Sequence, residues 1–398
     1  DEVGYVHPQF WQEGENALLL SYNTNFYRYV NKKKEKFTQD NFYLSLRSGF
    51  NLGKWHFRDD SHFSYQNGSK NRWHNNARYL QRGIAKLEAD LKIGDFYTSS
   101  ELFSALPCRG LTLTTDNSMR PSSQQGFAPI VRGVAKTNAL VSIYQSETLI
   151  YQENVPPGEF ALSHLQPTGS GGDLKVVVLE ADGEEQQYTI PFSAVPGMIK
   201  AGSYTYQLAA GEPRLGQSAY RPNFVQGEGY YGVSNLVTLY GGTLISSDYY
   251  SLVFGSGWNL PIGALSFDVS HASAQLPNSR KQGQSYRLSY SKFLDTTATN
   301  FTLAAYRYST KGYYSFTDLI YAKDRYQQTT SREDDNALKP LDLSHYDSLR
   351  GGRPRNTFSL NVNQRLTEGY GSFYFTGTQR DYWSETGKSR EFQFGYAN

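Results

Sequence analysis

The residues that could support catalysis or metal binding are few. His56, Asp60 and His62 alternate along an apparent strand, so their side chains share one face and could approach one metal ion. No further ligands or supporting partners are indicated, so we interpret these residues as part of a polar strand face. The segment 387–389 (Gly-Lys-Ser) resembles the end of a phosphate-binding loop, but Tyr382 stands where the first glycine would be and no helical pattern follows.

Other signatures of chemistry are missing from the sequence. Neither G-x-S-x-G nor H-E-x-x-H occurs. We therefore expect no catalytic residues, no cofactor, no metal and no enzymatic activity. The net charge of +2 arises from 39 basic and 37 acidic residues, so no strong field favours nucleic acid as a partner. The single cysteine, Cys108, leaves no intramolecular disulfide to expect.

Alternating hydrophobicity is the main structural signal. Apolar residues occupy every second position in several segments, for example at 286–290 and 358–362. This pattern is typical of strands with one apolar and one polar face. We expect about sixteen such segments of roughly 9 to 13 residues, which is the length that a tilted strand needs to cross an outer membrane. The mean hydropathy of −0.60 does not argue against a membrane barrel, because barrel strands are apolar at only every second residue.

The connections between the first strands are predicted to alternate in length. Long and tight connections follow each other at 31–40, 52–53, 67–73 and 82–83. Bacterial outer-membrane barrels have long outer loops and short periplasmic turns. If the N-terminus is periplasmic, the sixth strand, about 109–115, ends at the periplasmic rim. A second long connection, 323–355, is expected to be a functional loop with a short helix.

The segment 126–196 interrupts the series of long strands. Its apolar stretches are short, and turn residues separate them sharply: Pro156, Pro157, Gly158, Gly172, Asp173 and Gly183. We interpret it as a small β-sandwich inserted between strands 6 and 7 of an all-β transmembrane antiparallel barrel. The expected domains are residues 1–120 for the first part of the barrel, 121–198 for the plug and 199–398 for the continuation of the barrel.

Several motifs resemble one known family. They include Asn51-Leu-Gly-Lys-Trp55, Arg109-Gly110, Gly126-Phe-Ala-Pro129, Arg132-Gly-Val-Ala135, Val155-Pro-Pro-Gly158, Glu180-Ala-Asp-Gly183 and Tyr240-Gly-Gly-Thr243. Over essentially its whole length the chain resembles the outer-membrane ushers of the chaperone/usher pathway, which assemble pili and fimbriae.

The resemblance implies a fold and a function. Ushers have a twenty-four-stranded barrel with an inserted plug, so this chain would contain an incomplete barrel that is cut short at the C-terminus. It would lie in the bacterial outer membrane, in contact with lipid, as a protein-translocation pore. Its partners would be periplasmic chaperone–pilus subunit complexes, with a homodimer as a further possibility. No nucleic acid and no cofactor are expected.

Charged residues around the plug are candidates for seating and gating it. They are Arg109, Asp116, Arg120, Arg132, Glu180 and Asp182. The alternative explanation is that these residues form turns and contacts inside the inserted module. For Asp182-Gly183, a hairpin turn explains both residues. In ushers the hairpin that corresponds to 96–107 helps to hold the plug. Cys108 departs from the aromatic residue that the family usually has before Arg-Gly.

Three other functions remain open on the sequence alone. A porin or nutrient transporter could use the inserted module as a selectivity domain. An outer-membrane hydrolase could use the barrel as a scaffold. The module could also be an adhesin displayed outside the cell.

Overall fold

The computed structural model describes most of the chain. The described residues are 10, 14–31, 37–68, 71–116, 131–145, 148–162, 174–190, 199, 201–215, 218–294, 300–333, 353–366, 371–383 and 388–397. Two β modules and one long helix, α1 (Phe316–Glu333), account for nearly all regular structure in these ranges. No helix in the described ranges is long and apolar enough to cross a bilayer.

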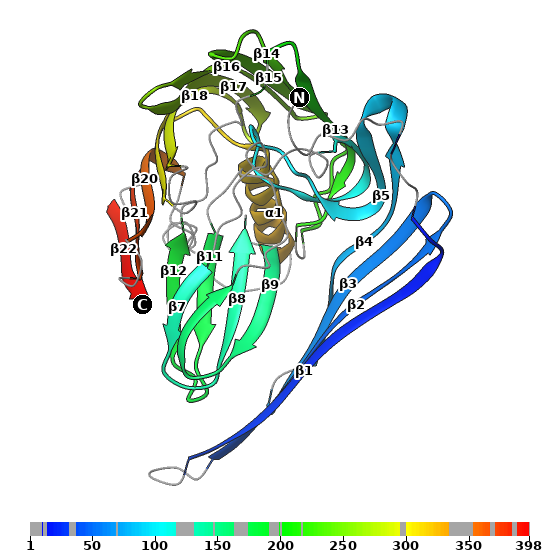
Figure 1. Ribbon diagram of the computed structural model, residues 1–398, viewed down its shortest axis with the longest axis vertical. Coiled ribbons are helices and arrows are strands. Elements are labelled where there is room, and N and C mark those ends of the chain that lie inside the picture. The colour runs from blue at the N-terminus through cyan, green and yellow to red at the C-terminus, as the bar shows by residue number, and fades with distance from the viewer. Residues whose placement is uncertain are drawn as a thin grey trace.

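A curved antiparallel sheet of sixteen strands forms the larger module, called the barrel wall below (Figure 1). Its strands, in spatial order, are β1 (Ala17–Asn31), β2 (Phe37–Leu52), β3 (Trp55–Gln66), β4 (Arg72–Ile84), β5 (Ala89–Tyr97), β6 (Pro107–Thr115), β13 (Tyr204–Pro213), β14 (Phe224–Gly232), β15 (Val237–Ser246), β16 (Tyr249–Leu260), β17 (Gly263–Gln275), β18 (Arg280–Leu294), β19 (Asn300–Ser309), β20 (Pro354–Arg365), β21 (Ser372–Tyr382) and β22 (Lys388–Ala397). Among the described residues the sheet is open, with β1 and β22 as its edges.

The two faces of the barrel wall have opposite character. On β18, Tyr286 and Leu288 are 38% and 50% exposed, whereas Arg287 between them is 4% exposed. On β20, Phe358 is 48% exposed and the neighbouring Ser359 is 6% exposed, which repeats this arrangement. The apolar side chains thus point outward and the polar side chains point toward the lumenal side of the curved sheet, which confirms the alternation predicted from the sequence.

The smaller module, the plug, lies inside the curve of the barrel wall (Figure 1). It contains a four-stranded sheet in the order β12-β11-β8-β9 and a two-stranded sheet of β10 and β7. The strands are β7 (Val131–Ala135), β8 (Ala139–Gln145), β9 (Thr148–Val155), β10 (Gly158–Leu162), β11 (Leu174–Leu179) and β12 (Glu185–Ile190). Their inner faces share a hydrophobic core that contains Val141, Ile143 and Val176.

The plug is inserted between neighbouring strands of the barrel wall. β6 pairs directly with β13, with Leu111 opposite Ala210, although the whole plug lies between these strands in the sequence. This confirms the predicted insertion between the sixth and seventh barrel strands. The expected domain boundaries at 120/121 and 198/199 adjoin segments outside the described residues.

Some local predictions were wrong. A tight turn was expected at 82–83, but β4 continues to Ile84 and a 3₁₀ turn, Ala85–Leu87, follows it. Gly83 marks a strand position, and the reversal is made by Glu88, a non-glycine residue with φ of 47°. The helix expected within 323–355 begins earlier, at Phe316. The tight turn expected at 52–53 lies one residue later, at Gly53 and Lys54, because Leu52 is still paired with Trp55.

Candidate functional site

One edge of the plug sheet is held by two tyrosines of the barrel wall. β9 is an edge strand, so half of its backbone groups have no partner within the sheet. The hydroxyl of Tyr43 on β2 donates to the carbonyl oxygen of Gln152 at 2.5 Å. The hydroxyl of Tyr97 on β5 donates to the carbonyl oxygen of Leu149 at 3.2 Å. Two side chains of the wall thus take the place of a neighbouring strand.

The opposite edge of the same sheet contacts the last strands of the wall. The backbone N–H of Thr189 on β12 donates to Glu391 Oε2 at 2.7 Å. The two-stranded sheet of the plug is held at the same strands, because Gln393 Nε2 donates to the carbonyl oxygen of Arg132 on β7 at 2.8 Å. The Arg132 guanidinium group lies over the Tyr374 ring, 5.1 Å from its centroid. Both edges of the plug are therefore held by a few polar contacts, which can be broken and remade at modest cost.

Removal of the tyrosine hydroxyls should loosen the plug. Each hydrogen bond contributes about 1 kcal/mol, so Tyr43→Phe with Tyr97→Phe should raise the plug-opening equilibrium constant roughly thirtyfold. Open probability in planar bilayers measures this change. Tyr206→Phe is the matched control, because the Tyr206 hydroxyl donates to the carbonyl oxygen of Leu87 within the wall, at 3.0 Å. Equal opening in the double variant and the control would contradict a holding role.

A hairpin between β5 and β6, residues 98–106 and called the lumenal hairpin, is fixed by a carboxylate of β14. Glu228, which is 7% exposed, accepts from the Ser100 hydroxyl at 2.6 Å and from the Glu101 N–H at 3.1 Å. The Leu102 N–H lies 3.4 Å from the same carboxylate. Phe103 belongs to the hydrophobic cluster on the lumenal side of the wall. The hairpin is thus seated by one buried acid and an apolar contact.

The base of the lumenal hairpin contains a bidentate ion pair. Arg109 Nε and Nη2 lie 2.7 and 3.0 Å from the two carboxylate oxygens of Asp95. Arg214 Nη1 adds a contact of 3.1 Å to Asp95 Oδ2. Arg109 lies on β6, Asp95 lies on β5 and Arg214 follows β13. The plug is inserted between β6 and β13. The ion pair therefore ties the insertion point to the hairpin.

Helix α1 packs against the same hydrophobic cluster. A capping box starts it: Ser315 Oγ accepts from the Asp318 N–H at 3.1 Å, and Asp318 Oδ2 accepts from the Ser315 N–H at 3.0 Å. Leu319 and Ile320 are fully buried. Further along, Lys323 forms an ion pair with Asp248 in the turn after β15, and this contact lowers the Asp248 pKa below its ordinary value.

The candidate residues from the sequence lie in different places. Arg109 is in the wall, paired with Asp95, and Arg132 is at the contact between the plug and β21 and β22. The N–H of Asp116 donates to the Glu88 carbonyl oxygen at 2.9 Å, just after β6 ends. Pro156 and Pro157 connect β9 to β10, and Gly158, the first residue of β10, has a φ of 119°. Three of the candidates, Arg120, Gly172 and Asp173, lie outside the described residues.

Glu180 stabilises a turn inside the plug. Its buried carboxylate accepts from the N–H groups of Lys136 and Thr137 at 2.9 and 2.8 Å and from the Thr137 hydroxyl at 2.6 Å. Asp182 Oδ1 accepts from the Glu184 N–H at 3.0 Å, and Gly183 has a φ of 89°, as in a tight turn. Burial alone would raise the Glu180 pKa, but the three hydrogen bonds together lower it below its ordinary value.

Acidification should therefore destabilise the plug. A carboxyl group with a lowered folded-state pKa stabilises the fold fully above its unfolded pKa, ordinarily near 4.5, and this stabilisation is lost as the pH falls through the folded value. Hydrogen exchange of residues 131–145, corrected for the intrinsic effect of pH, should accelerate below about pH 4.5. Glu180→Ala should cost about 2 kcal/mol at neutral pH. An unchanged acid response in this variant would assign the effect to another group.

Sequence reasoning missed the residues that make the long-range contacts, namely Tyr43, Tyr97, Glu228, Glu391 and Gln393. For Glu228 the sequence contains one indication. A carboxylate in a Gly- and Tyr-rich strand is expected to need a hydrogen-bond partner on the polar face. The tyrosines carried none, since many tyrosines alternate along this chain.

Comparisons with known proteins agree on one family. A family model described as "Outer membrane usher protein" matches residues 43–398. The outer membrane usher protein YehB of Escherichia coli K12 is 41% identical over 400 residues, which cover 100% of this chain and 47% of the relative. The chain thus spans about half the length of the curated relatives it matches.

Two solved structures are similar in fold. The translocation pore of the P pilus usher PapC matches 95% of this chain and 73% of its own, with a TM-score of 0.75 and 27% identity. The E. coli P pilus tip assembly intermediate PapC-PapD-PapK-PapG matches 98% of this chain and 46% of its own, with a TM-score of 0.57 and 27% identity.

Proposed function

Because this chain belongs to the outer membrane usher family, we propose that it forms the plugged wall of a pore that secretes pilus subunits across the bacterial outer membrane. The usher family is a family of translocation channels rather than of enzymes, and for this chain no covalent chemistry is required. The family match supports this function and not the porin or nutrient transporter alternative.

The observation that carries the proposal is the way in which the plug is attached. It is inserted between two strands that pair directly, and its sheet is held at both edges by side chains of the wall. A domain tethered at one seam and held elsewhere by single hydrogen bonds can leave the lumen without unfolding the wall. Residues 121–198 would move as this unit, between wall segments 1–120 and 199–398.

The proposed partners are chaperone–subunit complexes that arrive from the periplasm. The similar protein PapC is found with PapD, PapK and PapG in a P pilus tip assembly intermediate, which supports this proposal. Subunits would be transferred by exchange of β-strands between chaperone and subunit, which needs no nucleotide or other cofactor. Lipid would contact the outward apolar face, and a second copy of the chain would complete a homodimer.

Deletion of residues 125–195 from the whole protein tests the plug. We expect large, stable ion currents in planar bilayers from the deletion variant and small currents from the unmodified protein. Currents that stay at the closed level after the deletion would refute the gating role.

Cross-linking tests whether the plug must move for secretion. Tyr43→Cys with Gln152→Cys, joined by a short bismaleimide, should hold the plug in the lumen and stop pilus assembly. Each single-cysteine variant, treated in the same way, is the control, and the native Cys108 is fully buried. Normal assembly by the cross-linked protein would exclude plug displacement as a required step.

A further inference from the structure

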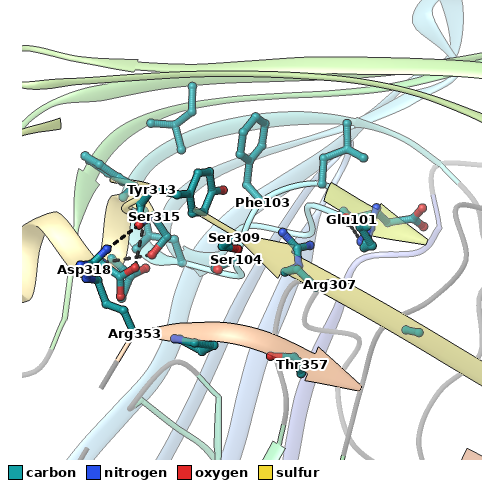
Figure 2. A pocket seen from close by; sticks show the side chains of 18 of the residues that line it. Glu101, Phe103, Ser104, Arg307, Ser309, Tyr313, Ser315, Asp318, Arg353 and Thr357 are labelled. Atoms are coloured by element: carbon teal, nitrogen blue, oxygen red, sulfur yellow. Dashed lines mark hydrogen bonds between the residues drawn. The ribbon is translucent and has the colours of Figure 1, made fainter. Parts of the chain in front are cut away.

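A cavity of about 310 Å³ lies between the lumenal hairpin, the start of α1 and the wall strands β18 to β21. Figure 2 shows Arg307 of the wall, Ser104 of the hairpin and Thr357 of β20 around this space. Four arginines line the cavity, Arg287, Arg307, Arg353 and Arg380, against two acids, Glu101 and Asp318. Its lining is therefore basic.

The strand register explains why these charges gather. One row of directly opposed residues crosses β17 to β21 in the order Asp268, Arg287, Arg307, Thr357, Arg380. Directly opposed residues share a face of the sheet, and here that face is the lumenal one. The row places three arginines beside a single aspartate.

Most of the other charged side chains at the cavity already form ion pairs or hydrogen bonds. Asp268 pairs with Arg287 at 2.8 Å, and Asp318 caps α1. Arg353 Nη1 donates to the carbonyl oxygens of Lys311 and Tyr313 at 2.6 and 2.9 Å. Asp268 also attracts Arg307 electrostatically, but its Oδ2 is bonded to Arg287, so among the described residues Arg307 has no carboxylate of its own.

Arg307 stands directly opposite another arginine, Arg287, which destabilises a strand pair unless an anion compensates. Within the described part of the chain it forms no ion pair, and its guanidinium group makes a single hydrogen bond, to Ser285 Oγ at 3.1 Å. A guanidinium group has five N–H donors, so most of them remain for a ligand.

We propose that this cavity binds a small tetrahedral oxyanion of the phosphate or sulfate type, held by Arg307. Guanidinium groups bind such anions through paired, charge-assisted hydrogen bonds. The hydroxyl groups of Ser104 and Thr357, which line the cavity, can donate to its remaining oxygens. Because Ser104 belongs to the hairpin and Arg307 to the wall, the bound anion joins the lumenal hairpin to the barrel wall.

Equilibrium dialysis of the intact protein in detergent against inorganic phosphate, at fixed ionic strength, tests the site. We expect one saturable site per chain, at least tenfold weaker binding in Arg307→Gln, and unchanged binding in Arg390→Gln, whose exposed side chain on β22 does not line the cavity. Excess sulfate should displace the phosphate, and chloride at the same ionic strength should not.

The opposite results would overturn the proposal. They are no saturable binding by the unmodified protein, equal binding by Arg307→Gln, or displacement by chloride as strong as that by sulfate. If Arg307→Gln does not assemble, Arg307→Lys replaces it, because lysine keeps the charge but loses the paired donors and should still weaken binding severalfold.

Discussion

Asp268→Ala is expected to destabilise the barrel wall by about 3 to 5 kcal/mol, because it leaves a buried guanidinium group without its anion. Asp268 Oδ2 lies 2.8 Å from Arg287 Nη2 and 2.9 Å from the Tyr240 hydroxyl. The side chains of the ion pair are only 3% and 4% exposed. Urea unfolding of the protein in lipid vesicles, followed by tryptophan fluorescence, measures the loss.

The same substitution should also loosen the lumenal hairpin. Arg287 Nη1 donates to the Glu101 carbonyl oxygen at 3.3 Å, so a displaced Arg287 removes a contact to the hairpin. Hydrogen exchange of residues 98–106 should therefore accelerate together with the loss of stability.

A double variant separates the charge from the packing. Asp268→Leu with Arg287→Met replaces the pair by apolar groups and should recover most of the lost stability, because no charge is then left buried alone. Asp40→Ala is the exposed comparison, since its partner Arg28 is 59% exposed, and it should change little. If the single and double variants are equally unstable, packing rather than the unpaired charge is the cause.

The sequence predicted the fold well because the strand signal is local. The alternation of apolar and polar residues at 286–290 and 358–362 depends only on neighbouring residues. It identified the polar and apolar faces of β18 and β20. Short apolar stretches and turn residues likewise identified the plug. The strand β9 is harder to predict from the sequence, because its polar residues Gln152, Glu153 and Asn154 interrupt the alternation.

The contacts of the site could not be predicted in this way. The sequence places Tyr43 on a strand, but only the register and curvature of the sheet bring it to Gln152, 109 residues later. Glu228 and Ser100 are 128 residues apart. Such pairs depend on how sixteen strands are staggered around the plug, and side-chain alternation alone does not determine that stagger.

The Arg109-Gly110 motif shows a second kind of constraint. Gly94, Gly110 and Gly211 are directly opposed across β5, β6 and β13, at the seam where the plug is inserted. A Cβ atom on Gly110 would overlap the carbonyl oxygen of Ala210, and one on Gly211 would overlap that of Arg109. The backbones approach too closely here for any side chain.

Gly110→Ala should therefore force the seam apart and cost about 3 kcal/mol, the upper range for overpacking. Because β6 and β13 carry the two ends of the plug, the plug should also seat poorly, and planar bilayers should show frequent openings. Gly83→Ala is the matched control, since its Cβ would lie 3.7 Å from Asp90 Oδ1, an ordinary contact. If Gly110→Ala is as stable and as closed as Gly83→Ala, the close approach at this seam does not hold the plug in register.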